Sequence, residues 1–278
     1  MAFAGVTVRD ALDGAVTAIG ASGSETARLD AELLLAHALG VDRTRLVMEP
    51  TREVSGDAVQ HFQDLVRRRS VMREPVAYLL GTKGFRYIDL QVDSRVLIPR
   101  PETELLVEVG LELPQHARVL DVGAGSGAIA LALKQERPDL DVTGSDVSAD
   151  ALAVARANSV RLGLDVTFVT ADLLDGAGGP WDAVISNPPY VAERDRDTLP
   201  HDVLHHEPAA ALFAGEDGLD TVRRLIEQVA ATATPLLALE IGAGQAGEVA
   251  ELMSAWSFTD TEARQDLAGI ERVVIGRR

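Results

Sequence analysis

Apolar residues in the first 80 positions of the chain recur mostly at the spacing of an α-helix. In residues 27–39 four of them share one helical face: Leu29, Leu33, Leu34 and Ala38. Gly40 follows at a position typical of a helix C-cap. Shorter segments predict further helices at residues 8–12, 56–69 and 76–80. The pattern therefore predicts a small helical domain over residues 1–81.

The pattern changes to β-prone residues and turn formers in residues 82–98, which predicts a β-hairpin linker. From residue 117 onward, short apolar runs alternate with helical segments. The predicted strands are residues 118–122, 141–146, 166–170, 181–186, 236–241 and 271–275, and the predicted helices are residues 128–135, 149–162, 219–231 and 246–256. Repeated β-α-β units with buried strands predict an α/β domain over residues 99–278, with a Rossmann-like, doubly wound and mostly parallel sheet.

The charge and the hydrophobic composition of the chain argue against nucleic-acid-binding and membrane-spanning proteins. The net charge is −17 and Lys83 and Lys134 are the only lysines, whereas nucleic-acid binding depends on basic residues that neutralise phosphates. We interpret the run Arg67-Arg68-Arg69 as a solvated helix face, and expect no direct binding to nucleic acid. No apolar run approaches the roughly 20 residues of a membrane span. Because the N-terminus also lacks a signal-peptide pattern, we expect a cytoplasmic protein without a membrane partner.

A glycine-rich segment follows the first predicted strand of the α/β domain. It comprises Asp121, Val122, Gly123, Ala124, Gly125, Ser126 and Gly127. Three glycines let the backbone turn sharply and approach a ligand closely at a helix N-terminus. The spacing Gly-x-Gly-x-Gly differs from the dinucleotide fingerprint, and the segment lacks the end of a P-loop. By itself it is equally compatible with a tight turn.

Acidic residues end the next two predicted strands. Asp146 lies 23 residues after Gly123, close to the spacing at which an acid meets ribose hydroxyls, although it could simply start a helix. Asp172 ends the third strand and is positioned to accept from an adenine amine, with Leu173 packing the ring. Each acid alone is more typical of a cap. Together with the glycine loop they outline an adenosine pocket.

Asn187-Pro188-Pro189-Tyr190 follows the fourth predicted strand. Two prolines end the strand and fix the backbone, so Asn187 lies at the carboxyl end of a strand, where open α/β sheets bind ligands. The Asn187 side-chain oxygen and the Pro188 carbonyl are acceptors. They suit a planar group with an NH2, such as a carboxamide or an exocyclic amine. A strand-ending turn is the alternative interpretation of the isolated tetrapeptide.

His205-His206-Glu207 is a weak candidate for a metal site. Adjacent histidines diverge, and no third ligand is evident at a suitable spacing. The chain also has no cysteine. We therefore predict no metal, and interpret Glu207-Pro208 as part of the loop that borders the substrate entrance.

Taken together, these segments resemble class I S-adenosylmethionine-dependent methyltransferases, and more narrowly the HemK/PrmC family of release factor glutamine-N5 methyltransferases. The resemblance extends over nearly the whole chain. The segments that carry it are residues 74–81, 98–104, 121–127, 187–190, 207–212, 218–219 and 240–242. Asn-Pro-Pro-Tyr is shared by amino-methylating enzymes, whereas Ile-Pro-Arg-Pro-Glu-Thr-Glu with a helical N-terminal domain is narrower.

The resemblance implies roles for the candidate residues. Gly123, Ala124, Gly125, Ser126 and Gly127 would hold the methionine part of the cofactor, Asp146 the ribose, and Asp172 with Leu173 the adenine. Asn187 and the Pro188 carbonyl would each accept from the NH2 of a substrate glutamine, with Asn187 also close to the cofactor. Pro189 would complete the slot and Tyr190 would narrow it. No strong general base is needed, because the nitrogen becomes acidic only after methyl transfer; S-adenosylhomocysteine is the other product.

The resemblance also implies the substrate: the glutamine of the Gly-Gly-Gln motif of class 1 peptide chain release factors. The alternatives are a ribosomal-protein glutamine-N5 methyltransferase, an adenine-N6 DNA methyltransferase, which the acidity of the chain opposes, and a cofactor-binding protein without catalysis. We expect a monomer whose helical N-terminal domain docks the protein partner.

Overall fold

Two units, each with its own hydrophobic core, make up the computed structural model, which describes residues 6–278. The first unit comprises Met1–Gly81 together with Pro200–His206. The second comprises Thr82–Leu199 and Glu207–Arg278. A short segment from the second half of the chain therefore folds with the N-terminal region.

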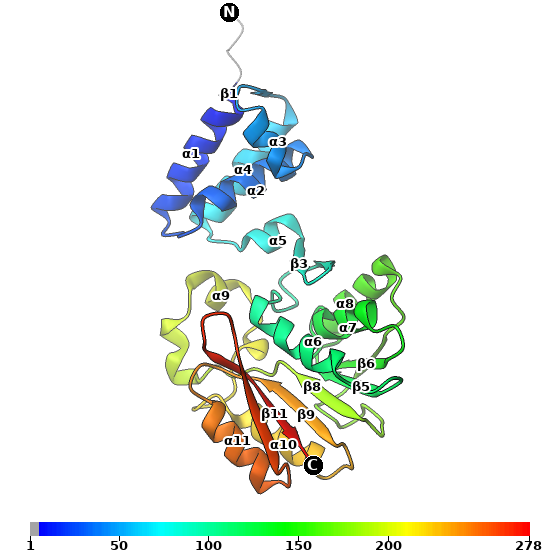
Figure 1. Cartoon of the computed structure of the whole chain (residues 1–278). Helices are drawn as coiled ribbons and strands as arrows, with labels where there is room; N and C mark the ends of the chain where they lie inside the picture. The colour runs from blue at the N-terminus through cyan, green and yellow to red at the C-terminus, as the bar shows by residue number, and fades with distance from the viewer. Residues whose placement is uncertain (1–5) are drawn as a thin grey trace, which may run out of the picture. The chain divides into compact units, whose positions relative to one another are not determined.

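The first unit is built from helices around an apolar core (Figure 1). Its helices are α1 (Val8–Ala21), α2 (Ala27–Leu39), α3 (Arg43–Met48), α4 (Asp57–Val71), α5 (Val76–Leu80) and α9 (His201–His206). Thr7 caps α1 in a capping box with Asp10, and Gly40 ends α2 in the left-handed conformation expected of it.

Two details of the helical prediction are wrong. Val6–Thr7 (β1) and Glu53–Val54 (β2) form an antiparallel pair, although the apolar pattern predicted only helices in this region. Leu29 was expected on the apolar face of α2 but is 41% exposed, while Leu34 and Leu35 are fully buried. The buried face of α2 is therefore rotated from the predicted one.

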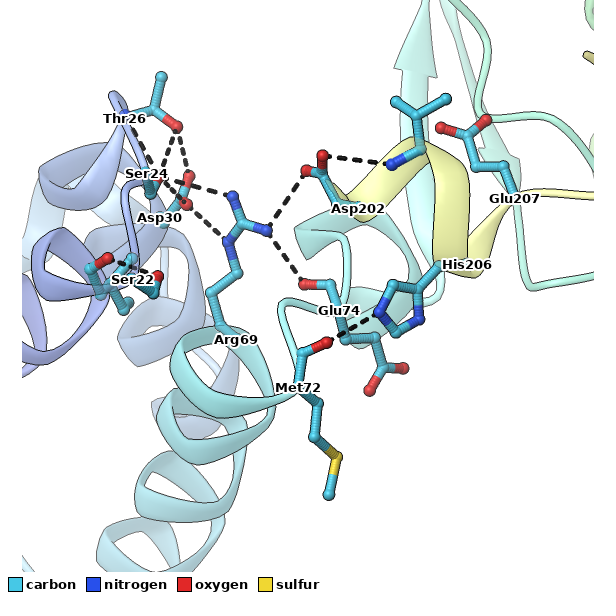
Figure 2. Close-up of polar contacts among 12 residues, drawn as sticks. Ser22, Ser24, Thr26, Asp30, Arg69, Met72, Glu74, Asp202, His206 and Glu207 are labelled. Carbon is cyan, nitrogen blue, oxygen red and sulfur yellow. Dashed lines mark hydrogen bonds and ion pairs between the residues drawn. The ribbon is translucent and has the colours of Figure 1, made fainter. Parts of the chain in front are cut away.

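Arg69 joins three segments of the first unit (Figure 2). Its Nε donates to Asp30 at 2.8 Å, and its Nη1 donates both to Asp202 of α9 at 3.4 Å and to the backbone oxygen of Glu74 at 3.3 Å. The side chain of Arg69 is only 12% exposed. The interpretation of Arg67-Arg68-Arg69 as a solvated face is thus wrong for Arg69.

The second unit is a seven-stranded sheet with helices packed on it (Figure 1). The strand order is β10-β11-β9-β8-β5-β6-β7. The five parallel strands are β5 (Arg118–Val122), β6 (Asp141–Asp146), β7 (Thr167–Thr170), β8 (Ala183–Ser186) and β9 (Leu236–Glu240). The last two, β10 (Asp260–Gln265) and β11 (Glu271–Arg277), pair antiparallel. This confirms the mostly parallel α/β fold, although β10 was not predicted.

Helices cover both faces of the sheet. They are α6 (Glu104–Leu111), α7 (Ala128–Glu136), α8 (Ala149–Leu162), α10 (Asp220–Ala230) and α11 (Ala246–Ala255). On β8, Val184 packs in one cluster with residues of α10 and α11, whereas Ile185 lies against Gly110 of α6. Because successive strand residues point to opposite faces, α6 and α10 lie on opposite sides of the sheet.

The hairpin predicted in residues 82–98 consists of β3 (Thr82–Phe85) and β4 (Ile88–Gln91). It belongs to the second unit and contacts α8. Across residues 6–278, none of the helices combines the length and the apolar character needed to cross a membrane.

Candidate active site

The candidate site lies where the strand order of the sheet reverses. β5 pairs with β6 on one side and with β8 on the other, so Val122 has both Ser145 and Ser186 as neighbours. Open α/β sheets bind ligands at such a switch point, beyond the carboxyl ends of the strands. A cavity of about 300 Å³ lies here, within the second unit. The sequence-predicted residues that line it are Gly123, Ala124, Gly125, Ser126, Asp146, Asp172, Leu173, Asn187, Pro188 and Pro189.

The glycine loop makes a sharp turn that is hydrogen-bonded to β6. Gly123, Gly125 and Gly127 all have positive φ angles, of 73°, 54° and 85°. The N–H groups of Gly123 and Ala124 both donate to the Ser145 carbonyl at 2.8 Å. Residues that carry a Cβ rarely adopt these backbone angles, so the turn itself requires the three glycines.

Gly127 is the one glycine of the loop that packs against neighbouring side chains and does not line the cavity. It is the N-cap of α7, outside the described cavity lining, and a Cβ there would lie 2.9 Å from a methyl carbon of Leu131 in α7 and 3.2 Å from the ring of Phe168 in β7. The position therefore serves the packing of α7 against the sheet. Its predicted contact with a cofactor stays a prediction.

Asp146 at the end of β6 fixes the loop as well as lining the cavity. One carboxylate oxygen accepts from the backbone N–H of Gly125 at 2.9 Å, and the other accepts from the N–H of Ser148 at 2.8 Å. Each carboxylate oxygen can accept a further hydrogen bond. Asp146 can therefore orient the loop and bind two hydroxyl groups of a ligand at the same time.

Asp172 and Leu173 form a tight turn at the end of β7. The backbone groups of Asp172 and Asp175 bond each other in both directions, and Leu173 between them has φ of +58°. Strained residues of this kind often mark ligand sites. Arg224 of α10 donates to the Asp172 carboxylate at 2.8 Å and also lines the cavity.

Asn187 follows β8, and its side chain is oriented by a residue 84 positions earlier. Its Nδ2 donates to the hydroxyl of Thr103 at 3.1 Å. Thr103 is buried and belongs to the short 3-10 helix Pro101–Thr103 that leads into α6. This leaves the amide oxygen of Asn187 as the group available to a ligand.

Tyr190 lies outside the described lining of the cavity. Its hydroxyl donates to Glu240 Oε1 at 3.3 Å, and its backbone oxygen accepts from the Gln245 side chain at 3.2 Å. Burial, together with the nearby Glu240 carboxylate, raises the pKa of the Tyr190 phenol. The phenol is therefore a neutral donor, and its predicted role in narrowing the slot stays a prediction.

Glu207 holds the segment that precedes Thr103. Its buried carboxylate accepts from the backbone N–H of Ile98 at 3.1 Å and from Arg100 at 2.5 Å. His206 belongs to the other unit, where its Nε2 bonds the Met72 carbonyl at 2.9 Å (Figure 2). In residues 6–278, no three His, Asp or Glu side chains are arranged as a metal site.

Sequence reasoning missed several residues of the site. Thr103, Val147 and Arg224 line the cavity. Asn158 of α8 is fully buried and donates to the Ser126 carbonyl while pairing with both backbone groups of Gln91. It thereby ties the hairpin to the glycine loop. An asparagine on the buried face of a predicted helix was the available signal, because a buried amide needs partners.

Known proteins match the chain over nearly its full length. The PrmC N-terminal domain matches residues 10–81, and the methyltransferase small domain matches residues 101–218. A release factor glutamine methyltransferase of Deinococcus radiodurans is 42% identical over 98% of both chains. Another, of Koribacter versatilis, is 41% identical over 98% of this chain and 99% of its own. The chain belongs to the release factor glutamine methyltransferase family.

A solved structure supports the fold independently. A methyltransferase from Pyrococcus furiosus superposes with a TM-score of 0.54 at 16% identity, covering 68% of this chain and 88% of its own. At this identity the likeness concerns the α/β fold alone. The family membership confirms the resemblance seen in the sequence.

Proposed function

We propose that this enzyme transfers a methyl group from S-adenosylmethionine to the side-chain amide nitrogen of the Gly-Gly-Gln glutamine in class 1 release factors. The supporting observation is that the glycine loop and the Asn187-Pro188 acceptors line one cavity. The names of the full-length relatives point to the same substrate. A protein substrate of the translation machinery also fits the expected cytoplasmic location and the charge of −17.

The residues of the cavity fit the cofactor. Gly123 and Gly125 leave the loop without side chains where a ligand approaches, Asp146 retains acceptor capacity for hydroxyls, and Leu173 offers an apolar surface. The cavity volume of about 300 Å³ lies at the lower end of the range for small-molecule sites. When bound, S-adenosylmethionine supplies an electrophilic methyl group; the other product is S-adenosylhomocysteine.

The chain's own residues would position the nucleophile. An amide nitrogen is a poor nucleophile because its lone pair is delocalised into the carbonyl. Asn187 Oδ1 and the Pro188 carbonyl would each accept a hydrogen bond from one of its two N–H groups. These two bonds would aim the nitrogen at the methyl group of the cofactor and stabilise the positive charge that develops on the nitrogen. The proton becomes acidic only after transfer, so no strong general base is required before it.

The helical unit would dock the protein partner, and we expect the enzyme to act as a monomer. No observation in the structure favours a ribosomal protein or DNA as the substrate. A single methyl-labelling assay distinguishes these two alternatives from the proposed substrate.

The test uses the full-length protein with S-adenosylmethionine labelled in its methyl group. Purified release factor, ribosomal proteins and DNA are incubated separately, and mass spectrometry locates the label. We expect label on the Gly-Gly-Gln glutamine, lost with Asn187→Ala while that variant still binds the cofactor. Label only on ribosomal protein or on DNA adenine would refute the proposal.

A further inference from the structure

Glu240 is a buried acid to which the proposed mechanism assigns no role. It is the last residue of β9 and is 1% exposed. A buried carboxylate loses its hydration, and it is tolerated only when hydrogen bonds or charges compensate. Its Oε2 has no hydrogen-bond partner in the described structure. A carboxylate in this position therefore costs folding stability, as expected of a residue that is retained for its contacts with the site.

The contacts of Glu240 lead to both ends of the Asn-Pro-Pro-Tyr segment. Tyr190 donates to Glu240 Oε1 at 3.3 Å, and the Thr103 hydroxyl lies close enough to this carboxylate to lower the pKa of Glu240. Thr103 in turn accepts from Asn187 Nδ2 at 3.1 Å. One acid thus connects the first and last residues of the tetrapeptide, all within the second unit.

The direction of these hydrogen bonds is fixed by proton counting. An ionised carboxylate only accepts, whereas a hydroxyl has a single hydrogen to donate. An ionised Glu240 attracts the Thr103 hydrogen, and the Thr103 oxygen is then left to accept from the NH2 of Asn187, as the 3.1 Å contact from Nδ2 has it. The oxygen and nitrogen ends of an amide have nearly the same shape, so partners of this kind decide which end faces a ligand.

We propose that Thr103 and Glu240 are positioning residues that lock the Asn187 side-chain amide with its oxygen toward the substrate slot. In the opposite orientation, Asn187 would present an NH2 to the NH2 of the incoming amide, and two donors would face each other. This inference rests on the proposed function, because it explains how that acceptor is held in place.

The preferred orientation of the Asn187 side-chain amide depends on the charge of Glu240. Burial raises its pKa to about 7, against the lowering effect of its hydrogen bonds with Thr103 and Tyr190; Glu102 raises it and Arg272 lowers it. Protonated Glu240 no longer requires the Thr103 hydrogen, so the preference for one orientation weakens. The fraction of correctly oriented Asn187 should therefore fall as the pH falls through about 7.

The chain offers a direct spectroscopic test, because Asn158 and Asn187 are its only asparagines. Protein labelled with ¹⁵N-asparagine gives two side-chain NH2 groups, which Asn187→Ala assigns. In Thr103→Val the NH2 signals of Asn187 should shift and exchange faster with water, while those of Asn158 stay in place. In the wild-type protein the Asn187 signals should titrate near pH 7, and Glu240→Gln should abolish that titration.

Kinetics provide the second readout. Because Thr103→Val removes the hydrogen bond that orients Asn187, it should lower kcat roughly fivefold to tenfold. Its Kd for S-adenosylmethionine should change less than twofold, and Thr103→Ser should restore most of the lost turnover. Unchanged Asn187 signals in Thr103→Val, or equal losses in Thr103→Ser and Thr103→Val, would overturn the inference. A wild-type enzyme that leaves release factor unlabelled would instead refute the proposed function, since the NMR test does not depend on activity.

Discussion

Gly218 lies directly against the backbone of Tyr190, the last residue of the tetrapeptide at the site. A Cβ built on Gly218 would overlap the Tyr190 carbonyl oxygen and lie 2.9 Å from the nitrogen of Ala192. Gly218 also has φ of +82°, in the left-handed region. Both the space and the conformation therefore require glycine here, 28 residues after Tyr190 in the sequence.

Replacing Gly218 by alanine should displace Tyr190 and the chain that follows it. We expect kcat to fall by at least about tenfold, because small misplacements of a positioned group are costly in catalysis. Gly247→Ala is the matched control, since a Cβ at that position in α11 would meet nothing within 4 Å. Steady-state kinetics of both variants provide the measurement. Equal activity of the two variants would show that Tyr190 tolerates displacement.

Asp146→Asn should weaken cofactor binding. The asparagine would replace one of two carboxylate oxygens by an NH2, which would face the backbone N–H of either Gly125 or Ser148. Loss of a hydrogen bond to a charged group costs about 1.5–3 kcal/mol, so the Kd for S-adenosylmethionine should rise at least tenfold by calorimetry. Asp141→Asn, at the exposed start of the same strand, should leave it unchanged. Equal affinity of both variants would exclude Asp146 from the binding site.

Much of the fold could be predicted because its strands are buried on both faces. Segments such as Val119–Leu120 and Ala183–Ile185 are apolar and fully buried, as expected of strands covered on both faces. β10 was missed for the opposite reason. All residues of Asp260–Gln265 except Ala263 are polar, because the strand lies at the edge of the sheet and pairs only with β11. Its sequence therefore has no apolar alternation to detect.

The candidate site was predictable wherever a residue lies at a strand end. Asp146 and Asn187 could be located in this way, and both line the cavity. Thr103 could not, because a single threonine before a helix resembles a cap, and its role comes from contact with Asn187, 84 residues later. The pairing of Arg69 with Asp202 across 133 residues was equally hidden, since no local pattern encodes it.

Arg69→Met should destabilise the helical unit. Arg69 and Asp30 have side chains only 12% and 7% exposed, so removing the guanidinium leaves Asp30 as a buried charge without this partner. Breaking a buried pair in this way costs about 3 kcal/mol. Hydrogen exchange of the amides in α2 and α4 should therefore become faster by about a hundredfold.

Arg67→Met is the control for this prediction. Arg67 lies on the same helix and pairs with Asp64 at 3.1 Å, but both side chains are about half exposed. Exposed pairs of this type contribute roughly 0–1 kcal/mol. Comparable exchange rates in the two variants would mean that Arg69 does not hold the unit together.

Asp121, at the end of β5 before the glycine loop, should make stability depend on pH. It is fully buried; one oxygen accepts from the Ala130 N–H at 3.1 Å, and the other has no partner in the described structure. Burial raises the pKa of Asp121 to about 7, with a further rise from the charge of Asp146 and an opposing effect of the Ala130 hydrogen bond.

Between pH 4 and 7, folded Asp121 retains a proton that the unfolded chain, with an Asp pKa of about 3.9, has released. The contribution of Asp121 to stability therefore falls as the pH rises, by up to about 1.4 kcal/mol per pH unit, and levels off above about pH 7. Asp121→Asn keeps an oxygen for the Ala130 N–H but does not ionise, so its stability relative to wild type should increase from pH 5 to pH 8. Urea unfolding at several pH values measures this, with Asp165→Asn at an exposed position as the control for net charge. Parallel pH profiles for Asp121→Asn and wild type would mean that Asp121 is already ionised at pH 5 in the folded protein.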